Sequence, residues 1–284
     1  MAEPDFIAAL KALVNDPAAR NLDDDAAVLE VGGETLILTH DTLVQGVHVR
    51  EDENPADIAW KLIAVNLSDL AAKGAKPLGV LVSHMLGDGD ARFVEGLGEI
   101  LQEYDVPLLG GDTVSAEGRR VWGCTAIGRA THTPVPDRRA AQPGDGVYVT
   151  GSLGRAMLGF EEDRRFDKAY RRPEPRLREG ELLAPLVSAM MDISDGLLLD
   201  SLRMAEASGV GIELESGSIP VADPSRRDDC IRWGDDYELL FTLPEGVADP
   251  VPATRIGSVN PRTDASLFLD GEPLGRADKL GYSH

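Results

Sequence analysis

Two aspartates interrupt an apolar stretch in the second half of the chain. The segment MMDISDGLLLD (190–200) places Asp192 and Asp195 among methionine, isoleucine and leucine residues. An ionised carboxylate in apolar surroundings costs several kcal/mol unless a cation or hydrogen bonds compensate it. The segment therefore predicts a positively charged partner for these two side chains.

A predicted helix over 55–75 carries the same kind of interruption. Its apolar stripe consists of Ile58, Leu62 and Val65, which recur at helical spacing. Asp69 occupies the next position of that stripe, where a leucine is expected. Asp69 either points into the interior, toward the same kind of partner, or reaches water at the helix end.

Three further segments present aspartate at the end of an apolar element. Asp41 follows a predicted strand, Asp112 follows two glycines in LLGGDT, and three successive aspartates (23–25) precede a short apolar strand. Each alone is weak, because aspartate is common at strand ends and helix caps. Together, five segments from both halves of the chain suggest carboxylates around one centre. Oxygen ligands of this kind suit Mg²⁺, so the sequence predicts a cluster of magnesium ions.

Other phosphate and hydrolase chemistries fit the sequence poorly. No lysine directly follows a glycine, which excludes a Walker A loop. The chain has no G-x-S-x-G elbow and no H-E-x-x-H pair. The glycines of TGSLGRAMLG do not form a G-x-G-x-x-G fingerprint.

Composition excludes several classes of partner. The 284 residues carry a formal net charge of −21, which argues against nucleic acid or an anionic membrane surface. No apolar run approaches the roughly 20 residues of a membrane helix. The two cysteines, Cys124 and Cys230, match no zinc or redox spacing. We therefore expect a reducing, cytoplasmic environment.

The order of predicted elements indicates an α/β or α+β protein, because strands alternate with helices along the chain. Before the linker we expect these elements: strands over 34–44, 78–86 and 119–130, helices over 55–75 and 90–105, and a short strand over 106–113 that breaks into a glycine turn. Residues 131–145 are rich in proline and turn formers. They predict a boundary between a domain over 1–132 and a domain over 133–284.

Eight segments, taken in order, resemble the thiamine-monophosphate kinases. These segments are DDAAVL, THDTLVQGVH, WKLIAVNLSDLAAKGAKP, LLGGDT, PGDGVYVTGSLG, MDISDGLLLD, GDDYELLFT and the C-terminal GYSH. The family belongs to the superfamily of aminoimidazole ribonucleotide synthetase. The resemblance implies cytoplasmic homodimers that transfer the γ-phosphate of ATP to thiamine monophosphate. It also implies a two-domain synthetase-like fold, with an N-terminal mixed sheet that forms a barrel-like dimer core and a C-terminal α/β domain.

The resemblance assigns site residues by motif. The implied magnesium ligands are Asp25, Thr39, Asp41, Asp69, Asp112, Asp192 and Asp195. The implied ATP contacts are Gly111, Asp112, Arg138 and Ser194. The implied contacts to thiamine monophosphate are His48, Asp235 and Tyr282, whose ring could stack on a flat heterocycle. Asp192, Asp195 and Arg138 carry the implied catalytic roles, because bridged phosphates need metal and positive charge rather than a protein nucleophile.

Four positions depart from the family pattern. Asp23 and Trp233 stand where glycine is usual, and His40 replaces a small hydroxyl residue. Asp235 replaces a glutamate expected to contact the substrate, and it is one methylene shorter. These changes put the number of metal ions and the substrate affinity in question.

Two alternatives remain open from the sequence. The first is another ATP-dependent enzyme of the same superfamily, although some of these depend on a reactive terminal cysteine, and neither Cys124 nor Cys230 qualifies. The second is a catalytically inactive protein that binds metal or thiamine phosphate, which the four departures permit.

Overall fold

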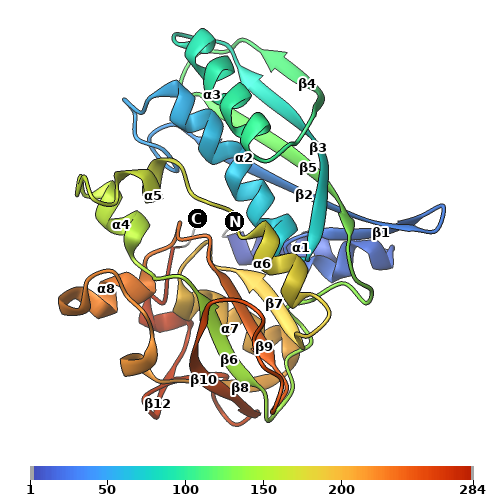
Figure 1. Ribbon diagram of the computed structural model, residues 1–284, viewed down its shortest axis with the longest axis vertical. Helices are drawn as coiled ribbons and strands as arrows, with labels where there is room; N and C mark the ends of the chain where they lie inside the picture. Colours follow the sequence, from blue (N-terminus) through green and yellow to red (C-terminus); the bar gives the residue numbers. More distant parts are fainter. Residues whose placement is uncertain (1–2, 283–284) are drawn as a thin grey trace.

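The computed structural model describes residues 3–282 and contains two mixed sheets, one above the other in Figure 1. The upper, five-stranded sheet has the order β1-β2-β5-β3-β4. Its strands are β1 (Ala27–Val31), β2 (Glu34–Val44), β3 (Ala75–Met85), β4 (Leu108–Val114) and β5 (Val121–Ala130). Strands β3 and β4 run parallel, and the other neighbours run antiparallel.

Two helices, α2 (Pro55–Ala72) and α3 (Asp90–Glu103), pack side by side on the five-stranded sheet (Figure 1). Helix α2 begins where expected, because the Asn54 side chain accepts a hydrogen bond from the Ala56 amide at 3.1 Å. Ile58 and Leu62 of α2 enter the same buried cluster as Ile37 of β2. This apolar stripe fixes which face of α2 meets the sheet.

The lower, seven-stranded sheet has the order β12-β11-β8-β10-β6-β9-β7. Its strands are β6 (Gly146–Thr150), β7 (Ala189–Asp192), β8 (Val210–Leu214), β9 (Leu239–Leu243), β10 (Ala253–Pro261), β11 (Leu267–Leu269) and β12 (Glu272–Leu274). Strands β8 and β11 run parallel, whereas the other neighbours are antiparallel.

Alternate residues of β7 face opposite sides of this sheet, and each side has its own cover. Met191 enters a buried cluster with Leu198 of helix α7 (Leu197–Ser208). Met190 enters another buried cluster with Ala71 of α2 and Leu183 of helix α6 (Leu177–Leu183). The C-terminal end of α2 therefore packs against the second sheet and joins the two halves of the chain.

The remaining helices are short. The α-helices are α1 (Glu3–Lys11), α4 (Arg155–Phe160), α5 (Asp167–Arg171) and α8 (Arg227–Arg232). The 3₁₀ helices are η1 (Pro17–Leu22), η2 (Ser216–Ser218), η3 (Pro224–Arg226) and η4 (Arg276–Asp278).

The predicted fold class, an α/β protein with one mixed sheet in each half, is confirmed. Among residues 3–282 neither sheet closes on itself, and the barrel-like core expected from two paired copies stays a prediction, as does the domain boundary at 132/133. The glycine turn predicted in 106–113 is wrong. Gly110 and Gly111 lie inside β4, because their positive φ angles of 155° and 154° let the ladder against β3 continue.

Within the described part of the chain, no helix has the length and apolar character needed to cross a membrane.

Candidate functional site

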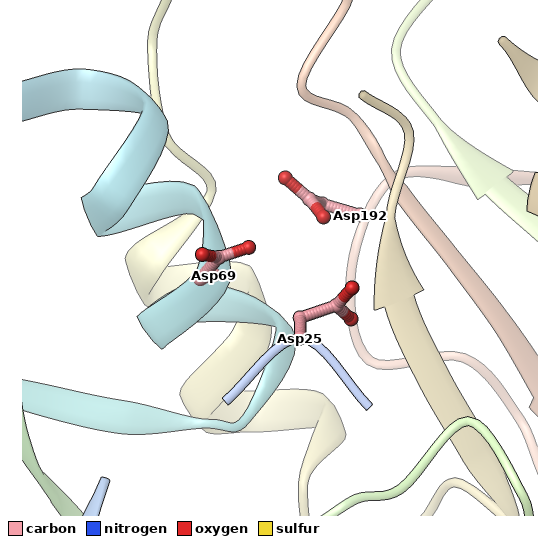
Figure 2. A group of neighbouring side chains, drawn as sticks. All are labelled: Asp25, Asp69 and Asp192. Atoms are coloured by element: carbon pink, nitrogen blue, oxygen red, sulfur yellow. The ribbon is translucent and has the colours of Figure 1, made fainter. Parts of the chain in front are cut away.

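Three of the predicted aspartates meet at the junction of the two halves. Asp25 lies just before β1, Asp69 lies near the end of α2, and Asp192 is the last residue of β7. One carboxylate oxygen from each lies within 4.8 Å of the others. Figure 2 shows the three side chains around a common space, with Asp69 approaching from the helix and Asp192 from the opposite side.

The alternation of β7 explains why Asp192 faces α2. Met190 packs toward α2 and Met191 packs away from it, so Asp192 returns to the α2 side. The side chain is buried, at 2% exposure, and accepts a hydrogen bond from Ser68 Oγ at 2.6 Å. A strand end and a helix end therefore present their carboxylates to each other.

Burial shifts the protonation of these carboxyl groups. Burial raises the pKa of Asp192 to about 6, and the charge of Asp41 adds to this rise. Burial raises the pKa of Asp69 well above its usual value, with Asp41 and Asp192 contributing. Such shifts mark carboxylates that lack enough positive charge around them.

Strand β2 brings Thr39 and Asp41 to the same place. Thr39 Oγ1 hydrogen-bonds with the Asp69 carboxylate and lies 3.2 Å from the Asp25 carbonyl oxygen. Burial raises the pKa of Asp41, while a hydrogen bond with Asp69 lowers it and the charge of Asp195 raises it. Thr39 and Asp41 therefore adjoin the three-aspartate cluster.

The loop after β7 positions Ser194 and Asp195. Asp195 forms an ion pair with Arg203 of α7 at 2.5 Å. The carbonyl oxygen of Ser194 accepts a hydrogen bond from the Asp235 amide at 2.8 Å. This loop therefore holds Asp195 where its charge acts on Asp41, and it is hydrogen-bonded to the segment that contains Asp235.

A group of cations surrounds the aspartates, and sequence reasoning recognised only one of them as functional. Arg138, from the linker, pairs with the Asp25 carboxylate. Lys73, the C-cap of α2, pairs with Asp24 and lies 3.5 Å from Asp25 Oδ2. Lys73 was missed, although it lies four residues after Asp69 and hence on the same helical face. Asp24 itself forms a second ion pair with Arg20 at 2.5 Å.

The predicted substrate contacts form a second cluster, built around another missed lysine. Lys61 Nζ donates to Asp235 Oδ2 at 2.7 Å and to the His48 carbonyl oxygen at 3.2 Å. The ammonium also lies 4.3 Å from the ring centre of Tyr170. Lys61 is buried, so it holds residues of both halves in one arrangement.

Tyr282 belongs to the same cluster. Its ring centre lies 6.5 Å from that of His48, and its amide donates to the Asp195 carbonyl oxygen at 2.9 Å. The preceding Gly281 permits this approach, because a Cβ there would lie 2.3 Å from the Asp195 carbonyl oxygen. The other two residues of GYSH, Ser283 and His284, lie outside the described residues.

Asp112 and Gly111 lie apart from these clusters within the single chain. Both are on β4, all of whose residues are exposed, and strands β5 and β3 separate β4 from the strand of Asp41. A Cβ on Gly111 would lie 1.9 Å from the Val82 carbonyl oxygen, so this close strand pairing requires glycine.

Three of the four residues that depart from the family pattern contact residues outside the two clusters. His40 Nδ1 lies 2.9 Å from Thr125 Oγ1 on an exposed part of the sheet. Asp23 pairs with Lys11 of α1. The Trp233 ring packs near Phe160, with 5.3 Å between ring centres. The fourth, Asp235, is held by Lys61.

Each half of the chain matches a known protein family. Residues 23–130 match the family described as AIR synthase related protein, N-terminal domain. Residues 142–253 match the family described as AIR synthase related protein, C-terminal domain. The two matches, in this order, define the class of protein to which the fold and the site correspond.

Individual relatives show which family within this class the chain resembles. The thiamine-monophosphate kinase of Escherichia coli K12 is 35% identical over 93% of this chain and 91% of its own length. That of Caulobacter vibrioides is 36% identical over 95% of this chain and 86% of its own length. A solved structure described as AaThiL complexed with AMPPCP and TMP is 28% identical, with a TM-score of 0.90 over 100% of this chain and 97% of the other. The chain belongs to the thiamine-monophosphate kinase family.

Proposed function

We propose that this chain transfers the γ-phosphoryl group of ATP to thiamine monophosphate and forms thiamine diphosphate. The observation that carries the proposal is the meeting of Asp25, Asp69 and Asp192, from both halves of the chain. Asp69 lies on the same helix as Lys61, which pairs with Asp235. The solved relative described as complexed with AMPPCP and TMP supports this proposal, because AMPPCP is an ATP analogue and TMP is the proposed phosphate acceptor.

The three-aspartate cluster fits divalent magnesium. Asp25 Oδ2 is buried without a hydrogen-bond partner, and the cluster offers oxygen donors, the ligand type that Mg²⁺ prefers. When bound, magnesium ions would neutralise phosphate charge in the transition state. We assign the ligands as the family motifs imply: Asp25, Thr39, Asp41, Asp69, Asp112, Asp192 and Asp195.

The residues of the chain act by positioning and by charge. The acceptor is a phosphate oxygen that is ionised near neutral pH, so the reaction requires no protein nucleophile. Arg138 supplies positive charge beside the phosphates, while Gly111, Asp112 and Ser194 contact ATP. Asp192 and Asp195 hold the donor end of the site in line with the acceptor.

His48, Asp235 and Tyr282 bind thiamine monophosphate in this proposal. Tyr282 is 42% exposed, and we assign its aromatic ring to stack on the flat heterocycle of the substrate. Asp235 is shorter than the glutamate of the family pattern, and Lys61 sets its position.

A second copy of the chain completes the enzyme. The exposed β4 strand presents Leu108, Leu109 and Val114 together with Asp112, and an exposed apolar edge of this kind favours pairing with another sheet. We therefore infer a homodimer whose paired N-terminal sheets form a barrel-like core. The buried free cysteines, Cys124 and Cys230, are compatible with a reducing cytoplasm.

A chromatographic product assay tests the proposed function. The full chain is incubated with ATP, Mg²⁺ and thiamine monophosphate, and unphosphorylated thiamine serves as the control acceptor. We expect thiamine diphosphate to form in step with ADP, and from the monophosphate alone. Binding of thiamine monophosphate without ADP formation would contradict the proposal and favour an inactive binding protein.

A further inference from the structure

Lys73 is a lysine whose side chain is entirely buried at the junction of the two halves. Its exposed fraction is 0%, and its ammonium group pairs with Asp24, whose side chain is also fully buried. The same ammonium lies 3.5 Å from Asp25 Oδ2 and 3.5 Å from the Met190 carbonyl oxygen. A buried ammonium is costly unless it is paired, so this position needs a specific reason.

Asp24 alone does not account for Lys73. The Asp24 carboxylate already forms an ion pair with Arg20 at 2.5 Å, and Arg138 Nε lies 3.8 Å from it. The additional charge of Lys73 therefore reaches beyond Asp24 to the neighbouring cluster. The contact at 3.5 Å with Asp25 Oδ2 places this charge at the edge of the cluster.

We propose that Lys73 is a built-in counter-ion of the cluster formed by Asp25, Asp69 and Asp192. Its ammonium group stabilises the cluster in the absence of divalent metal and competes electrostatically with metal when metal binds. Lys73 is thus a positioning residue that limits magnesium affinity. The inference rests on the proposed function, since it takes this cluster as the metal site.

If Lys73 has this role, removal of its charge should lower the stability of the metal-free protein and raise its affinity for Mg²⁺. Without the ammonium, the aspartates repel one another more strongly, so the metal-free protein loses stability. The same loss makes the site more negative, so it attracts Mg²⁺ more strongly. If Lys73 merely filled space or ordered the ligands, its replacement would instead lower both the stability and the magnesium affinity.

Lys73→Met and Lys73→Gln test the inference. Methionine keeps most of the unbranched apolar stem without the charge, and glutamine keeps a hydrogen-bond donor for Asp24. Lys61→Met is the matched control, because Lys61 is also a buried, ion-paired lysine of α2 but contacts Asp235 instead of the three-aspartate cluster. Magnesium binding is measured by calorimetry without nucleotide, and melting temperature is measured in EDTA.

We expect both Lys73 variants to bind Mg²⁺ about tenfold more tightly than the wild type and to melt several degrees lower in EDTA. Lys61→Met should keep the wild-type magnesium affinity. If Lys73→Met does not fold, Lys73→Gln carries the same expectation. Unchanged or weaker magnesium binding in the folded Lys73 variants would overturn the inference alone. A wild type that binds no Mg²⁺ would overturn the metal site of the proposed function and the inference with it.

Discussion

Helix α2 and its C-cap carry two buried lysines, Lys61 and Lys73, in different surroundings. Lys61 and Lys73 are twelve positions apart, about 18 Å along a helix axis. Lys61 meets one carboxylate, a backbone carbonyl oxygen and the face of Tyr170. Lys73 meets Asp24 and the edge of a cluster of further carboxylates.

The surroundings of the two lysines indicate which kind of ligand each end of the junction can bind. Around Lys61, one charge is balanced by one carboxylate and aromatic rings adjoin it, which suits a flat organic ligand. Around Lys73, carboxylates outnumber the cations and their pKa values rise, which suits metal ions and the phosphates they bridge. In the proposed function, one helix thus aligns the acceptor end and the donor end of the site.

Asp192→Asn should have the largest effect, because it removes a proposed metal ligand from the carboxylate-rich end. We expect turnover to fall at least about a hundredfold, while the melting temperature of the metal-free protein stays the same or rises as one buried charge is lost. Steady-state assays and calorimetric melting measure the two quantities. Near-normal turnover would remove Asp192 from the site.

Lys61→Met should act on the other end only. The loss of the ammonium releases Asp235 and the His48 loop, so we expect the KM for thiamine monophosphate to rise about tenfold while the KM for ATP changes little. Lys61→Arg, which keeps the charge, is the control and should recover part of the loss. An equal rise of both KM values would show that Lys61 supports the whole junction rather than the acceptor end.

Tyr282→Ala should have a similar but smaller effect on the acceptor. Loss of a stacking ring costs about 1 kcal/mol, which corresponds to roughly a fivefold rise in the KM for thiamine monophosphate. Tyr282→Phe keeps the ring and should behave like the wild type. If Phe and Ala variants are equally impaired, the hydroxyl group rather than stacking is responsible.

Asp236 should affect folding rather than turnover or KM, as a pH dependence of stability at the acceptor end. Burial raises its pKa from 3.8 to about 8, although Gly154 and Ala156 amides donate to it. The folded chain therefore holds this proton more tightly than the unfolded chain. The resulting stability is complete below pH 3.8 and is lost as pH rises through about 8.

Denaturant unfolding in EDTA between pH 5.5 and 7.5 measures this contribution. The free energy of unfolding of the wild type should fall more steeply with pH than that of Asp236→Asn, by at most about 1.4 kcal/mol per pH unit. Parallel pH profiles for the two proteins would contradict the protonation of Asp236.

Much of the junction could be predicted from sequence. The stripe of α2 pointed Asp69 inward, and the apolar surroundings of Asp192 predicted a positive partner; both aspartates lie in the cluster. These predictions depended on local periodicity, which one helix or strand determines by itself. The placement of Thr39 beside Asp69 was implied by the family resemblance rather than by periodicity.

The two lysines could not be predicted in the same way. Lysine in a helix usually reaches water, and Lys73 is buried only because the second sheet packs on the end of α2. The prediction of a turn at Gly110 and Gly111 was wrong for a related reason. The two glycines are typical of a turn, but the pairing of β4 with β3 keeps them in a strand. Burial and strand pairing of this kind depend on segments far apart in the chain.

A crystal structure with Mn²⁺, a non-hydrolysable ATP analogue and thiamine monophosphate tests the proposed metal and substrate sites together. Anomalous scattering locates the metal independently of the model of the protein. We expect manganese peaks among Asp25, Asp69 and Asp192, with the organic acceptor beside Lys61, His48 and Tyr282. Metal peaks elsewhere, or an acceptor bound away from Lys61, would contradict these sites.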